Sequence, residues 1–160
     1  MARTASATQR IEAAPGPIYD LVADLARMGQ WSPEATGAVG APRRVVAGDR
    51  FIGSNRRGPV RWWTVCTVLR AERGRVLEFD VDAGPLSISR WTYTFHPLAD
   101  GGTRVTETWL DRRDGLVGLP VRAAGRLLIP GDRAEHNRAN IRITLQRLKA
   151  AAEAGAGQDD

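Results

Sequence analysis

Five consecutive segments between residues 50 and 112 show the strand pattern that most constrains the fold of this chain. Apolar and polar residues alternate along them, and the connections between them are short, as at Gly84-Pro85 and residues 100–102. Short connections join antiparallel neighbours, because a parallel pair needs a crossover of a dozen residues or more. The sequence therefore predicts an antiparallel meander with strands at residues 50–54, 60–71, 76–83, 86–98 and 103–112.

One face of this predicted sheet is aromatic and the opposite face is polar. Side chains alternate between the two faces of a strand, and tight turns fix which residues lie opposite one another. Asp80 and Arg90 are expected to form an exposed ion pair on the polar face. The predicted facing pairs are Trp91 with Trp109, Tyr93 with Glu107, Phe95 with Val105, Phe79 with Trp91, and Asp80 with Arg90.

Helical patterns flank the predicted strands. Residues 7–14 have isolated strand character around Ile11, and the apolar spacing from Ile18 to Met28 predicts a helix that ends at Gly29. Residues 116–129 predict a short apolar helix, interpreted as a lid or a packing helix. A long final helix is expected to begin after Asp132 and to stop at Gly155. Its apolar face comprises Asn137, Ile141, Thr144, Leu145, Leu148 and Ala152.

Composition excludes several classes of protein. Hydrophobic residues make up 42% and charged residues 26% of the 160, an ordinary globular balance that argues against disorder. We therefore expect a single domain over residues 1–154 and a frayed tail at 155–160. With no apolar run of membrane-spanning length and no visible secretory signal, the expected location is cytoplasmic. The single cysteine excludes an internal disulfide framework.

The net charge of +5 does not by itself indicate nucleic acid as a partner. The basic residues are all arginine except Lys149, and they are scattered along the chain. A basic and aromatic cluster at residues 56–63 contains Trp62 and Trp63, but adjacent strand residues point to opposite faces. We place Trp62 inside the sheet with Thr64, and a split pair cannot form one stacking platform.

Several segments resemble the START-like helix-grip superfamily, in particular its polyketide cyclase/dehydrase-type (SRPBCC) proteins. The resemblance spans about residues 8–154 and is carried by residues 14–24, 31–34, 48–51, 61–64, 91–95, 102–107, 136–137 and 144–149. It implies an α+β fold in which a curved antiparallel sheet wraps around a long C-terminal helix and encloses a hydrophobic cavity. The strand pattern supports this fold independently, because the expected concave face is aromatic.

The expected cavity wall suits a planar or polycyclic apolar ligand. Tryptophan and tyrosine side chains offer large contact areas with a polar tip. The alternative is that these rings only fill a collapsed core. The predicted ligand-binding residues are Trp31, Trp62, Thr64, Cys66, Phe79, Val81, Trp91, Tyr93, Phe95, Val105, Trp109, Asn137, Ile141 and Leu145.

Glu107 is the candidate catalytic residue. A carboxyl group on an apolar face must be hydrogen-bonded or have its pKa raised by desolvation, which would suit a general acid or base. The alternative is a structural carboxylate. We expect no metal, because His96 points outward and His136 and Cys66 form no cluster with it. The absence of glycine-rich phosphate motifs predicts no nucleotide cofactor.

Two functions remain open at the level of the sequence. The first is binding of a hydrophobic aromatic, polyketide-like or lipid-like molecule in the internal cavity. The second is an aromatase/cyclase-like, cofactor-independent enzyme that cyclises or dehydrates a polyketide intermediate. Few polar side chains are expected inside, which favours binding. The sequence does not indicate the oligomeric state.

Overall fold

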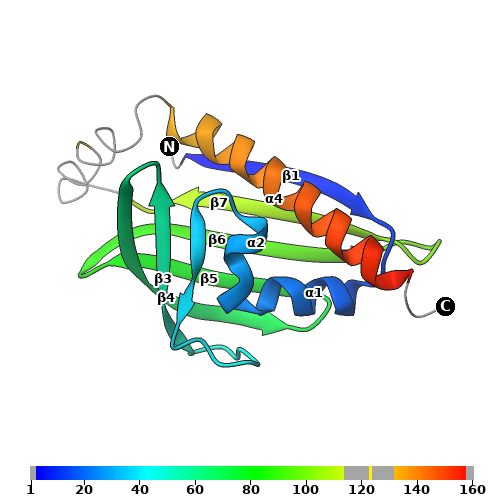
Figure 1. The fold of residues 1–160 in the computed structure, drawn as a ribbon. Coiled ribbons are helices and arrows are strands. Elements are labelled where there is room, and N and C mark those ends of the chain that lie inside the picture. The colour runs from blue at the N-terminus through cyan, green and yellow to red at the C-terminus, as the bar shows by residue number, and fades with distance from the viewer. Residues whose placement is uncertain (1–2, 114–122, 124–131, 158–160) are drawn as a thin grey trace.

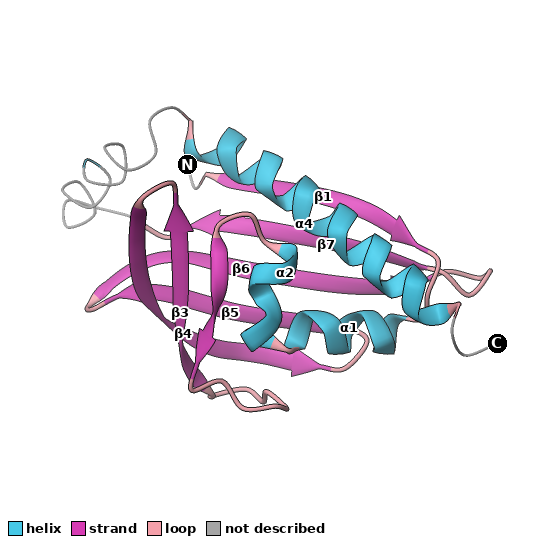
Figure 2. Ribbon diagram, in the orientation of Figure 1, coloured by secondary structure: helices cyan, strands magenta, loops and turns pink. Residues whose placement is uncertain are grey.

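A single seven-stranded antiparallel sheet forms the centre of the protein (Figure 1, Figure 2). The computed structural model describes residues 3–113, 123 and 132–157. The strand order is β1-β7-β6-β5-β4-β3-β2, so the chain forms a continuous meander from β2 to β7 and β1 lies beside β7. The strands are β1 (Thr4–Ile11), β2 (Ala35–Val39), β3 (Arg50–Arg57), β4 (Val60–Glu72), β5 (Val76–Ala83), β6 (Leu86–Pro97) and β7 (Thr103–Asp111).

The predicted register of the two central hairpins is confirmed. Glycines at positive φ form their turns, as at Gly84 between β5 and β6 (φ 59°) and Gly101 between β6 and β7 (φ 91°). These turns fix which side chains face each other across the hairpins. The facing pairs are Phe79 with Trp91, Asp80 with Arg90, Trp91 with Trp109, Tyr93 with Glu107, and Phe95 with Val105.

The two edge strands were less well predicted. β1 is a full strand that pairs with β7 from Thr4 to Ile11, rather than isolated strand character around Ile11. β2 has no counterpart among the five predicted strands. Its sequence, Ala-Thr-Gly-Ala-Val, lacks the alternation of large apolar and polar residues that marks a half-buried strand.

The predicted helix over residues 18–28 is divided into three short pieces. α1 (Pro15–Ala23) ends where Asp24 leaves the helical conformation, and it is followed by η1 (Leu25–Arg27) and α2 (Met28–Trp31). Gly29 does not end the helix as predicted, because it lies within α2. A Cβ atom at Gly29 would lie 2.6 Å from the carbonyl oxygen of Thr36, so this glycine allows α2 to approach β2.

The helix α4 (Arg133–Ala156) lies across the sheet and is the element that the sheet grips (Figure 1). Asp132 caps it as predicted, since its carboxylate accepts a hydrogen bond from Ala134 N at 2.9 Å. The helix continues past Gly155 to Ala156, which corrects the predicted stop, and the frayed tail stays a prediction. Its buried face is the predicted one: Asn137, Ile141, Thr144, Leu145, Leu148 and Ala152.

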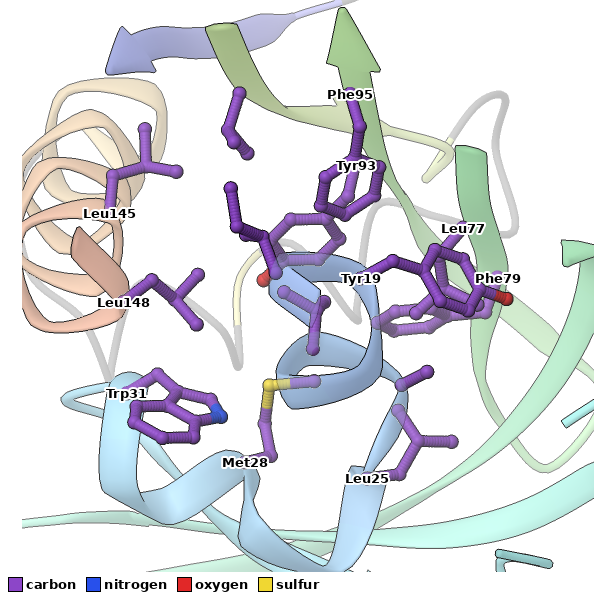
Figure 3. Packing of buried hydrophobic residues seen from close by; sticks show 14 of the residues in the cluster. Tyr19, Leu25, Met28, Trp31, Leu77, Phe79, Tyr93, Phe95, Leu145 and Leu148 are labelled. Atoms are coloured by element: carbon purple, nitrogen blue, oxygen red, sulfur yellow. The ribbon is translucent and has the colours of Figure 1, made fainter. Parts of the chain in front are cut away.

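The hydrophobic core lies where α4, the N-terminal helices and the sheet meet. Figure 3 shows Leu145 and Leu148 of α4 pointing toward Met28, Trp31 and the aromatic side chains of the sheet. Among the described residues, no helix is long and apolar enough to span a membrane. The cytoplasmic location stays a prediction, and the predicted helix at 116–129 lies almost wholly outside the described residues.

Asp80 and Arg90 are paired as predicted, but Asp80 is not exposed. Arg90 Nε donates to Asp80 Oδ1 at 2.7 Å, and Arg112 Nη1 lies 2.7 Å from Oδ2. The two arginine side chains cover the carboxylate, which leaves Asp80 8% exposed. Neither Asp80 nor Arg90 borders the internal cavity, so the predicted assignment of faces holds.

Candidate ligand-binding cavity

A cavity of about 400 Å³ lies between the concave face of the sheet and the helices. This volume is within the range of small-molecule sites. Its described walls come from the strands β2 to β7, the segment around Met28 and the first half of α4. The predicted ligand-binding residues that border it are Trp62, Thr64, Cys66, Phe79, Val81, Trp91, Tyr93, Trp109 and Ile141.

Aromatic side chains from neighbouring strands form much of the wall. Phe51 of β3 packs edge-on against Phe79 of β5, with ring centroids 5.9 Å apart. Trp91 and Trp109 face each other across β6 and β7, and both border the cavity. Trp63 also borders the cavity although it is 65% exposed, which the alternation of β4 did not predict.

Five residues that the sequence predicts as ligand-binding lie elsewhere in the described part of the chain. Phe95 packs edge-on against Tyr19 of α1, with centroids 5.6 Å apart, because α1 covers that end of the sheet. Val105 and Leu145 are buried in the core between the sheet and α4. Trp31 is buried at the end of α2. The fifth residue, Asn137, is described next.

Asn137 is fully buried on α4 but does not border the cavity. Neither its Oδ1 nor its Nδ2 atom has a hydrogen-bond partner among the described residues. A buried amide without partners is costly, by about 1–3 kcal/mol. Asn137 is not part of the described cavity wall, and nothing in the structure explains why an amide without partners is buried at this position.

The structure adds wall residues that the sequence did not predict. Phe51 and Gly53 of β3 are brought in by their pairing with Cys66 and Thr64 of β4, and the alternation of β3 could have indicated them. Thr144 lies on the predicted face of α4. Charged residues also border the cavity, and no local pattern indicated them: Arg3, Glu34, Arg113 and Arg133.

Glu107 is the buried acid of the cavity wall. Tyr93 donates its hydroxyl to Glu107 Oε1 at 2.7 Å, while Oε2 has no hydrogen-bond partner among the described residues. Burial raises the pKa of Glu107 to about 8, and the bond from Tyr93 lowers it only in part. The carboxyl group is therefore mainly neutral at pH 7, and Oε2 is the oxygen that Tyr93 leaves free.

The neighbouring polar groups of the wall are also uncharged. Burial and the nearby Glu107 raise the pKa of the Tyr93 phenol well above its usual value. Burial raises the pKa of the Cys66 thiol to about 11, and Thr64 Oγ1 lies 3.8 Å from its sulfur. A protonated thiol is a poor nucleophile, which argues against covalent chemistry at Cys66.

No group of three or more histidine, cysteine, aspartate and glutamate side chains could hold a metal ion within the described part of the chain. His96 is exposed on β6. His136 lies on α4 beside Asn140, whose Nδ2 atom is 3.1 Å from His136 Nε2. Burial is the main cause that lowers the pKa of His136, so the ring is neutral at pH 7.

A curved antiparallel sheet that grips a long C-terminal helix and encloses an apolar cavity defines the helix-grip class of α+β proteins. The chain belongs to the family described as polyketide cyclase / dehydrase and lipid transport, whose sequence profile matches residues 2–153. No curated protein matches the sequence.

Solved structures with the same fold include proteins from several bacteria. The Polyketide_cyc-like protein Cgl2372 from Corynebacterium glutamicum is 25% identical, with a TM-score of 0.63 over 98% of this chain and 94% of that one. Protein CV1439 from Chromobacterium violaceum is 15% identical, with a TM-score of 0.68 over 94% and 98%. The di-domain ARO/CYC StfQ of the steffimycin biosynthetic pathway is 18% identical, with a TM-score of 0.65 over 95% and 45%.

Proposed function

We propose that the protein binds a hydrophobic small molecule, aromatic, polyketide-like or lipid-like, inside its cavity. The observation that carries this proposal is the combination of a cavity of about 400 Å³, an aromatic wall and a neutral carboxyl group on that wall. An apolar wall gains free energy by removing ligand surface from water, at about 25 cal/mol per Å² of apolar surface. The family description, which names both polyketide chemistry and lipid transport, supports the same class of ligand.

Glu107 gives the ligand one point of polar recognition. Tyr93 already donates to Oε1, so the neutral acid has its own proton on Oε2 to donate to a keto or hydroxyl oxygen. Desolvation of a neutral acid costs much less than desolvation of a carboxylate. The wall is therefore suited to an uncharged oxygen of an otherwise apolar ligand.

A second candidate function is catalysis of aldol cyclisation or dehydration of a polyketide intermediate. The pKa of about 8 at Glu107 favours it, because a general acid–base group works best when its pKa is near the working pH. The carboxylate form would take a proton from a methylene carbon, and the enolate carbon would then bond to a second carbonyl carbon of the same chain. The acid form would give its proton to the alkoxide oxygen that forms at that second carbonyl. The steffimycin-pathway neighbour, called an ARO/CYC, has the same fold and supports this candidate.

Titration with a matched ligand pair tests the binding proposal. The wild-type protein and Glu107→Gln are titrated with anthracene and with a hydroxyanthraquinone, and the change in tryptophan fluorescence is followed. We expect both to bind the wild type. An amide retains a hydrogen-bond donor but is a weaker acid, so Glu107→Gln should weaken only the quinone.

The two arms of this titration separate the possible failures. If neither compound binds the wild type, the cavity does not take hydrophobic aromatic ligands and the proposal is wrong. If Glu107→Gln weakens anthracene and the quinone equally, Glu107 acts through the shape of the cavity and not through its acid group. Cyclase activity is tested separately, and its loss in Glu107→Gln should reach 100-fold or more.

A further inference from the structure

One end of the cavity carries an excess of positive charge. Arg3, Arg113 and Arg133 border it, and among the described residues the acidic ones that do so are Glu34 and Glu107. Glu107 is mainly neutral at pH 7, since burial raises its pKa to about 8. Arg3, Arg113 and Arg133 therefore border a mainly apolar space together with one ionised carboxylate, Glu34, while Asp111 pairs with Arg113 from outside the cavity wall.

The topology gathers these residues from distant parts of the chain. The start of β1, the end of β7, the start of α4 and the turn between β3 and β4 lie at the same end of the molecule (Figure 1). Backbone bonds connect them: Asp111 N donates to Arg3 O at 2.8 Å, and Arg56 N donates to Glu34 O at 2.8 Å. Arg113 and Arg133 border the cavity here, and Arg57 lies beside them in an adjoining hollow. We call these three residues the arginine end of the cavity.

Each arginine of this end has a different degree of pairing. Arg113 is held by Asp111, with Nε and Nη2 donating at 2.8 and 2.7 Å. Arg133 Nη2 donates to Glu34 Oε2 at a longer 3.2 Å. Arg57 lies in an adjoining hollow that shares Glu34 with the cavity, and its buried Nη1 has no partner among the described residues.

The electrostatics of this end favour an added anion. Burial is the main cause that lowers the pKa of the Arg133 guanidinium, and Arg113 and Arg57 lower it further. His136, whose pKa is lowered mainly by burial, adds no positive charge of its own at pH 7. Glu34 lies between the two groups, with Oε2 accepting from Arg133 Nη2 at 3.2 Å and Oε1 lying 3.6 Å from His136 Nε2. Glu34 and Asp111 offset part of this positive charge, and a further negative charge would reduce the remaining mutual repulsion of Arg57, Arg113 and Arg133.

We propose that the ligand carries an acidic group, a carboxylate or a phosphate, which binds at the arginine end while its hydrophobic body contacts the aromatic wall. This inference rests on the proposed function and specifies its class of ligand. The planar guanidinium fork matches the oxygens of carboxylates and phosphates, and the bonds are charge-assisted. The partly desolvated position of Arg133 strengthens them relative to a pair in water.

A displacement titration tests the acidic group separately from the cavity. The neutral fluorescent probe N-phenyl-1-naphthylamine is bound first, and it is then displaced by dodecanoate, dodecyl phosphate or dodecanol at pH 7.5. The three competitors have the same chain and differ in the head group. We expect both acids to displace the probe at concentrations at least tenfold below that of dodecanol. The stronger of the two acids identifies which head group the site prefers.

Three variants locate the effect. Arg133→Gln and Arg57→Gln should each reduce the preference for acids about tenfold, measured against the probe affinity of the same variant. Arg57 does not border the cavity, and Arg57→Gln disrupts no ion pair in the described residues. Glu34→Gln should increase the preference, because it frees Arg133 for the ligand. The control, Arg104→Gln, removes one exposed positive charge at the opposite end of β7 and should change nothing.

The outcomes distinguish this inference from the proposed function. Probe binding with equal displacement by acids and dodecanol would overturn the acidic subsite and leave the hydrophobic cavity standing. A preference for acids that Arg104→Gln reduces as much as Arg57→Gln would also overturn it, because the effect would then come from net charge. Failure of the wild type to bind the probe would overturn both.

Discussion

Tyr93 and Glu107 face each other across β6 and β7, and the phenol donates a 2.7 Å hydrogen bond to the buried carboxyl group. Both side chains point to the concave face because they occupy inward positions of their strands. Burial opposes ionisation of each of them. The pair is therefore a neutral polar group on an apolar wall, and its protonation determines how the cavity and the fold respond to pH.

Replacement of Glu107 by glutamine should change the pH dependence of stability. The pKa of Glu107 in the folded protein, about 8, lies above its ordinary value of 4.5. Between these two pH values the carboxyl group is mainly protonated in the folded protein and mainly ionised in the unfolded chain, so folding takes up a proton. The stabilising contribution is complete below pH 4.5 and is lost as pH rises to about 8, by at most about 1.4 kcal/mol per pH unit. Glu107→Gln should lack this slope and be the more stable protein at pH 9. Urea unfolding of both proteins at pH 5, 7 and 9 measures how the free energy of unfolding depends on pH.

Glu78→Gln is the matched control for this experiment. Glu78 accepts a hydrogen bond of 2.9 Å from Thr92 on the neighbouring strand, but it lies half-buried on the polar face. Glu78→Gln should retain the pH dependence of stability that the wild type shows. Equal pH profiles for the wild type and Glu107→Gln would show that Glu107 is ionised in the folded protein.

Leu145→Ala should destabilise the fold because Leu145 is 1% exposed between α4 and the sheet. Removal of a buried leucine side chain costs about 2–5 kcal/mol. Ile143→Ala is the control on the same helix, since Ile143 is 37% exposed, and it should change stability by about 0.5 kcal/mol or less. Thermal melts that show the same loss for both would mean that α4 is not gripped through its predicted face.

Gly29→Ala should destabilise the contact between α2 and β2. The added Cβ would meet the backbone of Thr36 at 2.6 Å, and relief of such overpacking costs about 1–3 kcal/mol. Gly155→Ala is the control, because no atom lies within 4 Å of its Cβ position in α4. That change should stabilise the protein by about 0.5–1 kcal/mol through helix propensity. Opposite signs in denaturant unfolding are the expected result.

Asp80→Asn should destabilise the protein by about 1–3 kcal/mol, since buried Asp80 accepts charge-assisted hydrogen bonds from Arg90 and forms an ion pair with Arg112. Asp20→Asn removes a pair of similar geometry with Arg73, but that pair is exposed to water. The loss of stability in Asp20→Asn should be smaller than in Asp80→Asn, because solvent screens the exposed ion pair. Equal losses would contradict the importance of burial at Asp80.

The sequence predicted the central part of the sheet well because its pattern is local. The alternation in β6 and β7, together with short turns, determines that Tyr93 meets Glu107 and that Trp91 meets Trp109. The alternation determines the face of a strand, but not which part of that face lies under a helix. Phe95 and Val105 share the concave face, yet they lie where α1 and α4 pack, so they belong to the core.

No sequence pattern indicated that Arg57, Arg113 and Arg133 would come together, although Arg57 belongs to the basic cluster at residues 56–63. Arg57 is the last residue of β3, Arg113 follows β7 and Arg133 is the first residue of α4, so many residues separate them and only the closure of the sheet around α4 brings them together. Arginines scattered through the chain are usually exposed surface residues. The burial of Asp80 was missed for a related reason, because Arg112 reaches it from beyond the end of β7.

The central claim is that a hydrophobic ligand binds inside the cavity, and a variant whose cavity is filled by a side chain tests it most directly. Val81 borders the cavity on β5, and Val81→Phe would place a ring into the space while adding only apolar surface. Native mass spectrometry of the wild type with N-phenyl-1-naphthylamine should show a one-to-one adduct, and the folded Val81→Phe protein should show at least a tenfold weaker one. An adduct of equal strength in both proteins, or none in the wild type, would contradict binding inside this cavity.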